Sequence, residues 1–235
     1  MRIPTWVFIL SVVGTGGVLV YNVVSAPKPT ADDAPVAEII SSAANSYGAP
    51  RHPVTDDMKK RAAAMDGQKL ADMTLPDDKG KPVQVSSILA EKPTLFLGIK
   101  DGCPCNLESQ HYFNDLYDHY GSKIGFYGVM DADAKVAKLF KESLLMEFPV
   151  LCSPKETKIF EALGTEQSVY STLVAKDGTI IKQWPGYSKA ILSEINDELA
   201  KLSGLDRVSL DLTMAPEEMT SGCFYGMPIG WDPNK

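Results

Sequence analysis

The chain has 235 residues, of which 44% are hydrophobic, and a formal net charge of −7 at pH 7. This length suits one folded domain with extensions, and the apolar content supports a packed core and excludes a chain that is disordered throughout. The acidic balance argues against a nucleic-acid partner, which would favour a basic surface. Four cysteines are too few for a disulfide scaffold of this size.

The amino-terminal end begins with an apolar run without charged residues over residues 3–24. As a helix this run would be roughly 33 Å long, which is enough to span a bilayer. We therefore expect residues 1–26 to form a single-pass transmembrane anchor, and Arg2 to place the rest of the chain on the periplasmic side of a cell inner membrane. A cleaved signal peptide ending at residues 24–26 is the alternative, which Pro27 disfavours. A mitochondrial inner membrane is a second alternative location.

The remainder divides into a linker, a domain and a tail. Proline, alanine and serine are frequent over residues 27–65, as in a linker, with short helices expected at 36–45 and 56–64. Domain-like patterns cover residues 66–205. Residues 206–235 form a tail rich in methionine, proline and glycine.

Apolar periodicity and turn residues within the domain predict an alternating order of strands and helices. Expected strands are 70–75, 82–88, 94–99, 124–130, 148–152, 168–175 and 179–184, and expected helices are 113–120, 136–144, 159–163 and 191–202. Ser188 is a predicted helix cap, as are Asp131 and Asp133. Strand–helix–strand units require parallel pairing, and the closing hairpin makes the predicted sheet mixed.

Cysteines flank a proline in the tripeptide Cys103-Pro104-Cys105, where the strand 94–99 meets a helical pattern. Backbone N–H groups at a helix start favour the thiolate over the thiol and lower the cysteine pKa. Because the thiolate is the nucleophile of disulfide exchange, this turn predicts redox chemistry, with Cys103 as the attacking thiol and Cys105 as its near partner.

The chain resembles the thioredoxin fold, and within it the redoxin branch, the alkyl hydroperoxide reductase and thiol-specific antioxidant superfamily. The resemblance rests on short stretches in the correct order, which are 67–76, 80–83, 102–108, 148–151 and 176–180. It implies an α/β thioredoxin-like fold, with a mixed central sheet and helices on both faces. The apolar run 3–24 adds one expected N-terminal transmembrane helix ahead of this fold.

The chain departs from the family pattern at its chemical positions. It has Cys-x-Cys where thioredoxins have Cys-x-x-Cys, and Lys100 where peroxiredoxins place a threonine. No arginine occurs between residues 62 and 206, and the stretch 168–172 lacks the proline that thioredoxins place beside the site. An efficient peroxidase is therefore not expected.

The other chemical residues have simpler interpretations. We expect Cys152 to be a buried core residue, with a role as resolving thiol as the alternative. Cys223 is a candidate resolving thiol, and its alternative is a tail that packs on the domain or on a partner. A metal site built from the two turn cysteines with His111, with or without His119, is disfavoured, because His111 follows Cys105 by six residues and lies on a different helix face. The sequence thus predicts neither a cofactor nor a metal.

Two functions remain open. The first is a membrane-anchored, periplasm-facing thiol–disulfide oxidoreductase of the redoxin type, which exchanges disulfides with a protein or a small thiol. The second is a redoxin-fold accessory subunit of a membrane protein complex without turnover. The incomplete active site, the anchor and the apolar segment 224–231 motivate the second.

Overall fold

The computed structural model describes residues 52–154, 158–229 and 231. A five-stranded sheet with the order β6-β5-β4-β7-β8 forms its centre. The strands are β4 (Thr94–Ile99), β5 (Gly125–Met130), β6 (Val150–Cys152), β7 (Ser171–Val174) and β8 (Ile180–Trp184). β5 pairs in parallel with both β4 and β6, whereas β7 is antiparallel to β4 and β8. The predicted mixed sheet is confirmed.

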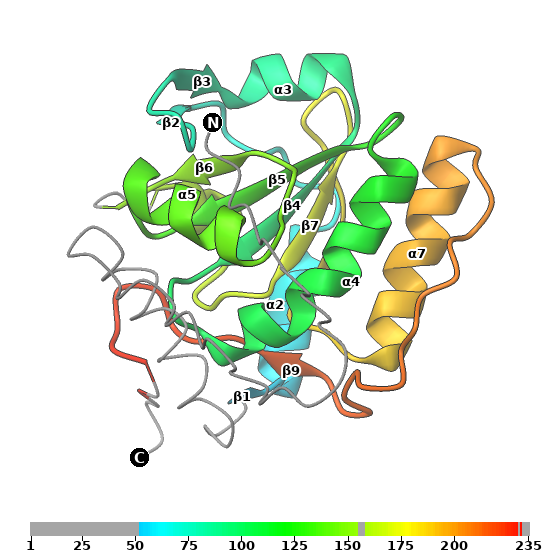
Figure 1. Ribbon diagram of the computed structural model, residues 1–235. Coiled ribbons are helices and arrows are strands. Elements are labelled where there is room, and N and C mark those ends of the chain that lie inside the picture. Colours follow the sequence, from blue (N-terminus) through cyan, green and yellow to red (C-terminus); the bar gives the residue numbers. More distant parts are fainter. Residues whose placement is uncertain (1–51, 155–157, 230, 232–235) are drawn as a thin grey trace, which may run out of the picture.

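Helices cover both faces of this sheet (Figure 1). α4 (Pro104–Tyr120), α5 (Ala134–Ser143) and α7 (Lys189–Ser203) contribute to one core cluster, and α3 (Val85–Glu91) and α6 (Lys158–Ala162) to the other. Side chains of β4 alternate between the two clusters, because successive residues of a strand point to opposite faces. Its Leu95 and Leu97 lie in the first cluster and Phe96 in the second.

Two of the three predicted caps begin helices as expected. The Asp133 carboxylate accepts the Val136 N–H at 3.0 Å at the start of α5. The Ser188 hydroxyl accepts the Ile191 N–H at 3.3 Å at the start of α7. The prediction for Asp131 is wrong, because its carboxylate instead pairs with the ammonium of Lys100.

Several predicted strands are shorter than expected, and for two of them the physical reason is clear. The first hairpin is present as β2 (Thr74–Pro76) and β3 (Pro82–Gln84), but the second half of the expected strand 82–88 is helix α3. Val85, Ile88 and Leu89 have helical spacing and are buried together. The expected strand 168–175 begins only at Ser171 as β7, because Val169 has a φ of 65° and leaves the extended conformation.

The folded body extends beyond residues 66–205 at both ends. Helix α2 (Asp56–Met65) packs against β8, so the expected helix at 56–64 belongs to the compact body. Strand β1 (His52–Pro53) pairs with β9 (Thr220–Ser221), which brings the tail onto the domain. The expected anchor and the expected helix 36–45 lie outside the described residues. In the part of the chain that is described, no helix has the length and hydropathy needed to cross a membrane.

Candidate active site around three thiols

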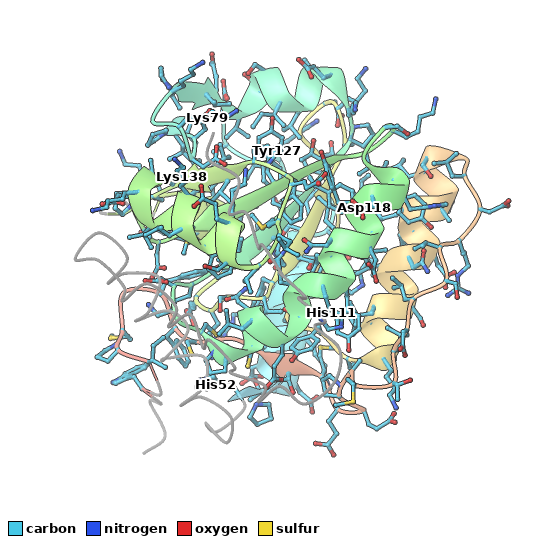
Figure 2. All side chains as sticks on the ribbon, viewed as in Figure 1. His52, Lys79, His111, Asp118, Tyr127 and Lys138 are labelled. Atoms are coloured by element: carbon cyan, nitrogen blue, oxygen red, sulfur yellow. The ribbon has the colours of Figure 1, made fainter. Side chains whose placement is uncertain are left out.

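The cysteine turn lies where β4 leaves the sheet and α4 begins. Cys103 is the N-cap residue of α4, and Pro104 occupies the first helical position, where its missing N–H costs nothing. The Cys103 carbonyl accepts the N–H groups of Asn106 and Leu107 at 3.1 and 3.2 Å. In Figure 2, His111 of α4 and His52 of β1 both lie toward one end of the molecule, and Asp118 of α4 lies farther from that end. The start of α4 therefore lies at the end of the molecule where β1 and β9 pair.

A buried asparagine holds the turn in place. Asn106 is 0% exposed, and its carboxamide accepts the Lys100 N–H at 3.0 Å and donates to the Gly98 carbonyl at 3.0 Å. These bonds tie the first turn of α4 to the end of β4. The position of Cys103 is thus fixed by a side chain that the sequence analysis did not single out.

Three of the four cysteines come together. Cys103, Cys105 and Cys223 are all buried, with 0%, 4% and 3% of their surfaces exposed, and none of them forms a disulfide. The Cys103 sulfur accepts the Cys223 N–H at 3.2 Å and the Ser168 hydroxyl at 3.4 Å. The structure therefore places the candidate resolving thiol beside the predicted nucleophile.

The surroundings of Cys103 favour its thiolate. Burial opposes ionisation, but hydrogen bonds from the thiols of Cys105 and Cys223, the Ser168 hydroxyl and the Asn106 N–H together hold the pKa of Cys103 well below its ordinary value. The hydrogen bond to Cys103 and burial raise the pKa of Cys105 instead. The pKa values of the two neighbouring thiols are thus shifted in opposite directions, with ionisation favoured at Cys103 and opposed at Cys105.

The stretch that lacks the thioredoxin proline has its own special geometry. No peptide bond of the described residues is cis. Val169 instead adopts a φ of 65° while fully buried, which is costly for a β-branched residue. Its N–H donates to the Gly98 carbonyl at 2.8 Å, which places Ser168 against the Cys103 sulfur. Val169 in a left-handed backbone conformation thus lies in the stretch that lacks the proline.

A nearly buried ion pair lies beside the cysteine turn. The Lys100 ammonium and the Asp131 carboxylate are 2.9 Å apart, with 10% and 13% of their side chains exposed. The same carboxylate accepts the N–H of Gly226 at 3.2 Å, so it connects β4 to the tail. Lys100 is where peroxiredoxins have a threonine, and here the lysine serves this contact.

The remaining predicted residues lie elsewhere. Cys152 is buried in β6, as predicted, and burial raises its pKa to about 12. The His111 ring packs against Tyr112, and the His119 ring lies 2.8 Å from the Asp206 carbonyl oxygen. Within the described residues, no group of three or more histidine, cysteine or acidic side chains is arranged to hold a metal ion.

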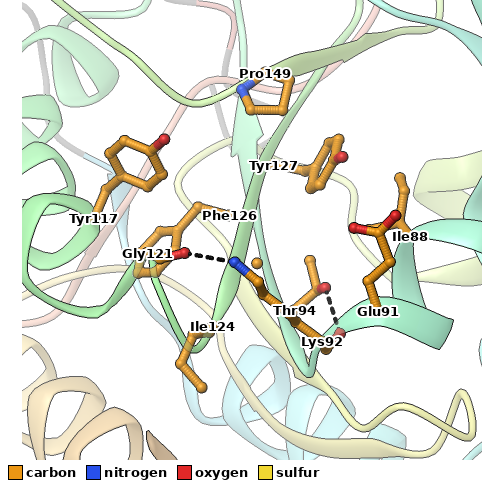
Figure 3. Close-up of a pocket in the computed structure, with 11 residues that line it drawn as sticks. Ile88, Glu91, Lys92, Thr94, Tyr117, Gly121, Ile124, Phe126, Tyr127 and Pro149 are labelled. Atoms are coloured by element: carbon orange, nitrogen blue, oxygen red, sulfur yellow. Dashed lines mark hydrogen bonds between the residues drawn. The ribbon is translucent and has the colours of Figure 1, made fainter. Parts of the chain in front are cut away.

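A hollow of about 150 Å³ lies at the other end of the central strands (Figure 3). Thr94, the first residue of β4, and Lys92 line it, and the Lys92 ammonium donates to the Gly121 carbonyl at 2.9 Å. β4 enters the sheet at this hollow and leaves it at the cysteine turn. The hollow therefore contributes nothing to the thiol site.

Known structures share this architecture. A candidate protein disulfide isomerase from Bacteroides thetaiotaomicron aligns over 59% of this chain and 90% of its own, with 16% identity and a TM-score of 0.53. A candidate thiol:disulfide interchange protein DsbE from Chlorobium tepidum aligns over 59% and 98%, with 22% identity and a TM-score of 0.53. The chain has a thioredoxin-like fold.

Other comparisons add little to that assignment. An uncharacterized conserved protein from Geobacillus kaustophilus aligns over 71% of this chain and 92% of its own, with 18% identity and a TM-score of 0.55. No protein-family model and no curated protein matches the chain. The thioredoxin-like fold expected from the sequence is confirmed, and the activity has to be argued from the site.

Proposed function

We propose that this protein is a thiol–disulfide oxidoreductase of the redoxin type in which Cys103 is the attacking thiolate. The observation that carries the proposal is the set of donors around the Cys103 sulfur, at a helix start, with two further thiols beside it. Such surroundings stabilise the thiolate, which is the reactive form in disulfide exchange. The neighbouring Cys105 and Cys223 are the candidate partners of a mixed disulfide.

The proposal includes a location. Residues 3–24 would anchor the chain in a cell inner membrane, and the domain would face the periplasm, an oxidising compartment where structural and catalytic disulfides persist. The partner would be a disulfide-bearing protein or small thiol. The apolar run of the sequence supports this location.

A redox titration tests the activity. The full chain is equilibrated in glutathione buffers of graded potential, trapped by alkylation and analysed by peptide mass spectrometry. We expect Cys103 to exchange over a defined range of potentials, Cys103→Ser to abolish exchange, and Cys152→Ser, the matched change of a buried thiol outside the cluster, to leave it intact. If Cys103 stays reduced in every buffer, both in the wild type and in a variant that exposes its sulfur to solvent, the proposal is wrong.

A second function rests on a different observation. Cys103 has no exposed surface, and three apolar side chains near the carboxyl end, Met227, Ile229 and Trp231, are 37–45% exposed. These features suit a redoxin-fold subunit that docks on a membrane partner without turnover. Gentle detergent extraction followed by sizing tests this function, since a free monomer would contradict it and a larger co-migrating complex would support it.

A further inference from the structure

The carboxyl-terminal segment Thr220–Gly226, here called the cap, crosses directly over the thiol site. Its backbone forms hydrogen bonds along both of its edges. Thr220 exchanges two bonds of 2.9 Å with Tyr187, and the Gly222 N–H and the Cys223 carbonyl pair with Ser168 at 2.9 and 3.0 Å. Strand β1 pairs with the other edge of its first residues. The cap is therefore a docked strand-like segment with a defined register.

The cap can approach the domain closely because glycines occupy the points of contact. A Cβ built on Gly98 would lie 2.3 Å from the Tyr225 hydroxyl oxygen, and one on Gly186 would lie 2.3 Å from the Thr220 carbonyl oxygen. A Cβ on Gly222, in the cap itself, would lie 2.0 Å from the Ser168 hydroxyl oxygen. A side chain at any of these three positions would require the neighbouring atoms to shift. A glycine in a strand such as β4 marks a close approach of this kind.

Tyr225 anchors the far end of the cap. Its ring stacks on Phe160 with 3.8 Å between the ring centroids, and its N–H donates to the Glu166 carbonyl at 3.0 Å. Its hydroxyl lies over Gly98 in β4. The anchor thus sits on one sheet face while Cys223, two residues earlier, belongs to the core cluster of the other face.

The docked cap closes the site to any outside disulfide. Exchange requires the attacking and the attacked sulfur atoms to come into contact, yet Cys103 is 0% exposed. The backbone N–H of Cys223 lies against its sulfur. With the cap in place, the only thiols that the structure brings to Cys103 are those of the chain itself.

We propose that the cap is displaceable, and that its departure and return control the exchange reaction of Cys103. This inference rests on the proposed function. With the cap displaced, the Cys103 thiolate attacks an external disulfide, forms a mixed disulfide and releases one partner thiolate. When the cap returns, the Cys223 thiolate attacks the Cys103 sulfur and releases the second. The products are a Cys103–Cys223 disulfide and a partner dithiol, and the chain is reset by an external dithiol that is oxidised in turn.

The substitution Gly98→Ala tests the cap without touching a cysteine. Its methyl group collides with the Tyr225 hydroxyl, whereas its next contact, the Tyr170 carbonyl at 3.5 Å, is ordinary. Tyr225→Phe removes that hydroxyl and leaves the ring carbon at 3.6 Å, so the double variant restores the fit. Tyr225→Phe alone is the matched control.

The full chain is reduced, mixed with oxidised glutathione and sampled by mass spectrometry for the mixed disulfide on Cys103. Hydrogen exchange of residues 220–226 reports cap opening in parallel. We expect Gly98→Ala to speed mixed-disulfide formation by about tenfold or more, since reaction of a buried group is limited by local opening. The double variant should return to the wild-type rate. In a Cys105→Ser background, adding Cys223→Ser should make the mixed disulfide accumulate, because no neighbouring thiol is then left to resolve it.

The outcomes separate the two proposals. Equal rates in wild type and Gly98→Ala, despite faster hydrogen exchange of the cap, would overturn the displaceable cap while leaving exchange at Cys103 intact. Absence of any mixed disulfide in an opened variant would overturn the proposed function itself. If Gly98→Ala does not fold or does not open the cap, Tyr225→Ala, which removes the ring stacked on Phe160 and leaves β4 unchanged, decides by the same comparison.

Discussion

Asn106 is the residue whose removal should most directly disturb the cysteine turn. Its carboxamide bonds the Lys100 N–H and the Gly98 carbonyl, each at 3.0 Å, in a site without exposed surface. The Gly98 carbonyl keeps a second donor, the Val169 N–H at 2.8 Å, after Asn106→Ala. The Lys100 N–H loses its acceptor, and a small cavity opens.

A buried N–H without an acceptor costs about 1–3 kcal/mol, and with the cavity we expect Asn106→Ala to lower the free energy of unfolding by about 2–4 kcal/mol. Asn114→Ala is the matched control on the same helix, where the partly buried carboxamide donates to the Leu144 carbonyl at 3.0 Å. That loss should be only about 0.5–1.5 kcal/mol. Asn106→Leu fills the cavity but leaves the Lys100 N–H without its acceptor, so it should remain clearly destabilised.

Urea denaturation of the three variants measures these losses, and the ultraviolet absorbance of the thiolate follows the Cys103 pKa. The turn loses its link to β4 in Asn106→Ala, so the donors around the sulfur should align less well and the Cys103 pKa should rise toward its ordinary value. Equal losses for Asn106→Ala and Asn114→Ala, with an unchanged Cys103 pKa, would refute the assignment of Asn106 as the residue that positions the thiol.

Three further predictions concern charge and backbone strain. Because the pKa of Cys103 is lowered in the folded state, the free energy of unfolding of the wild type should increase relative to that of Cys103→Ser as the pH rises from the folded-state pKa to the ordinary thiol pKa. This difference should disappear as the pH falls through the folded-state pKa. Denaturant titrations of both proteins at several pH values that show no such difference would contradict a Cys103 thiolate. Lys100→Met leaves the Asp131 carboxylate, 13% exposed, without its cation, so it should lower the free energy of unfolding by about 2–4 kcal/mol in chemical denaturation. Adding Asp131→Asn should recover part of this loss, whereas additive losses would argue against a coupled pair. Leu145 has a φ of 52° and is 81% exposed, so Leu145→Gly should raise the free energy of unfolding by about 0.5–1 kcal/mol. Leu144→Gly, at a φ of −109°, should lower it. A lower melting temperature for Leu145→Gly than for Leu144→Gly would contradict the backbone strain at Leu145.

Local sequence patterns predicted much of the fold because they report local causes. The apolar run of β4, the helix start at Cys103 and the caps Asp133 and Ser188 were all recognisable from neighbouring residues. The expected strand at 82–88 was half wrong, because its alternation at the start gives way to helical spacing that a short window does not resolve. Gly98, inside a buried strand, indicates that another segment packs closely on β4, but the sequence does not show that this segment carries Tyr225.

The sequence by itself determined that two cysteines sit at a helix start, because strand, turn and helix are contiguous there. Only the tertiary structure decided that Cys223 lies against Cys103, since the two are 120 residues apart and the tail has no periodic pattern that predicts its path. The contact depends on β1 pairing with β9, on Ser168 beside a strained Val169, and on the space above Gly98. Each of these is a relation between distant backbones, which no local pattern of residues encodes.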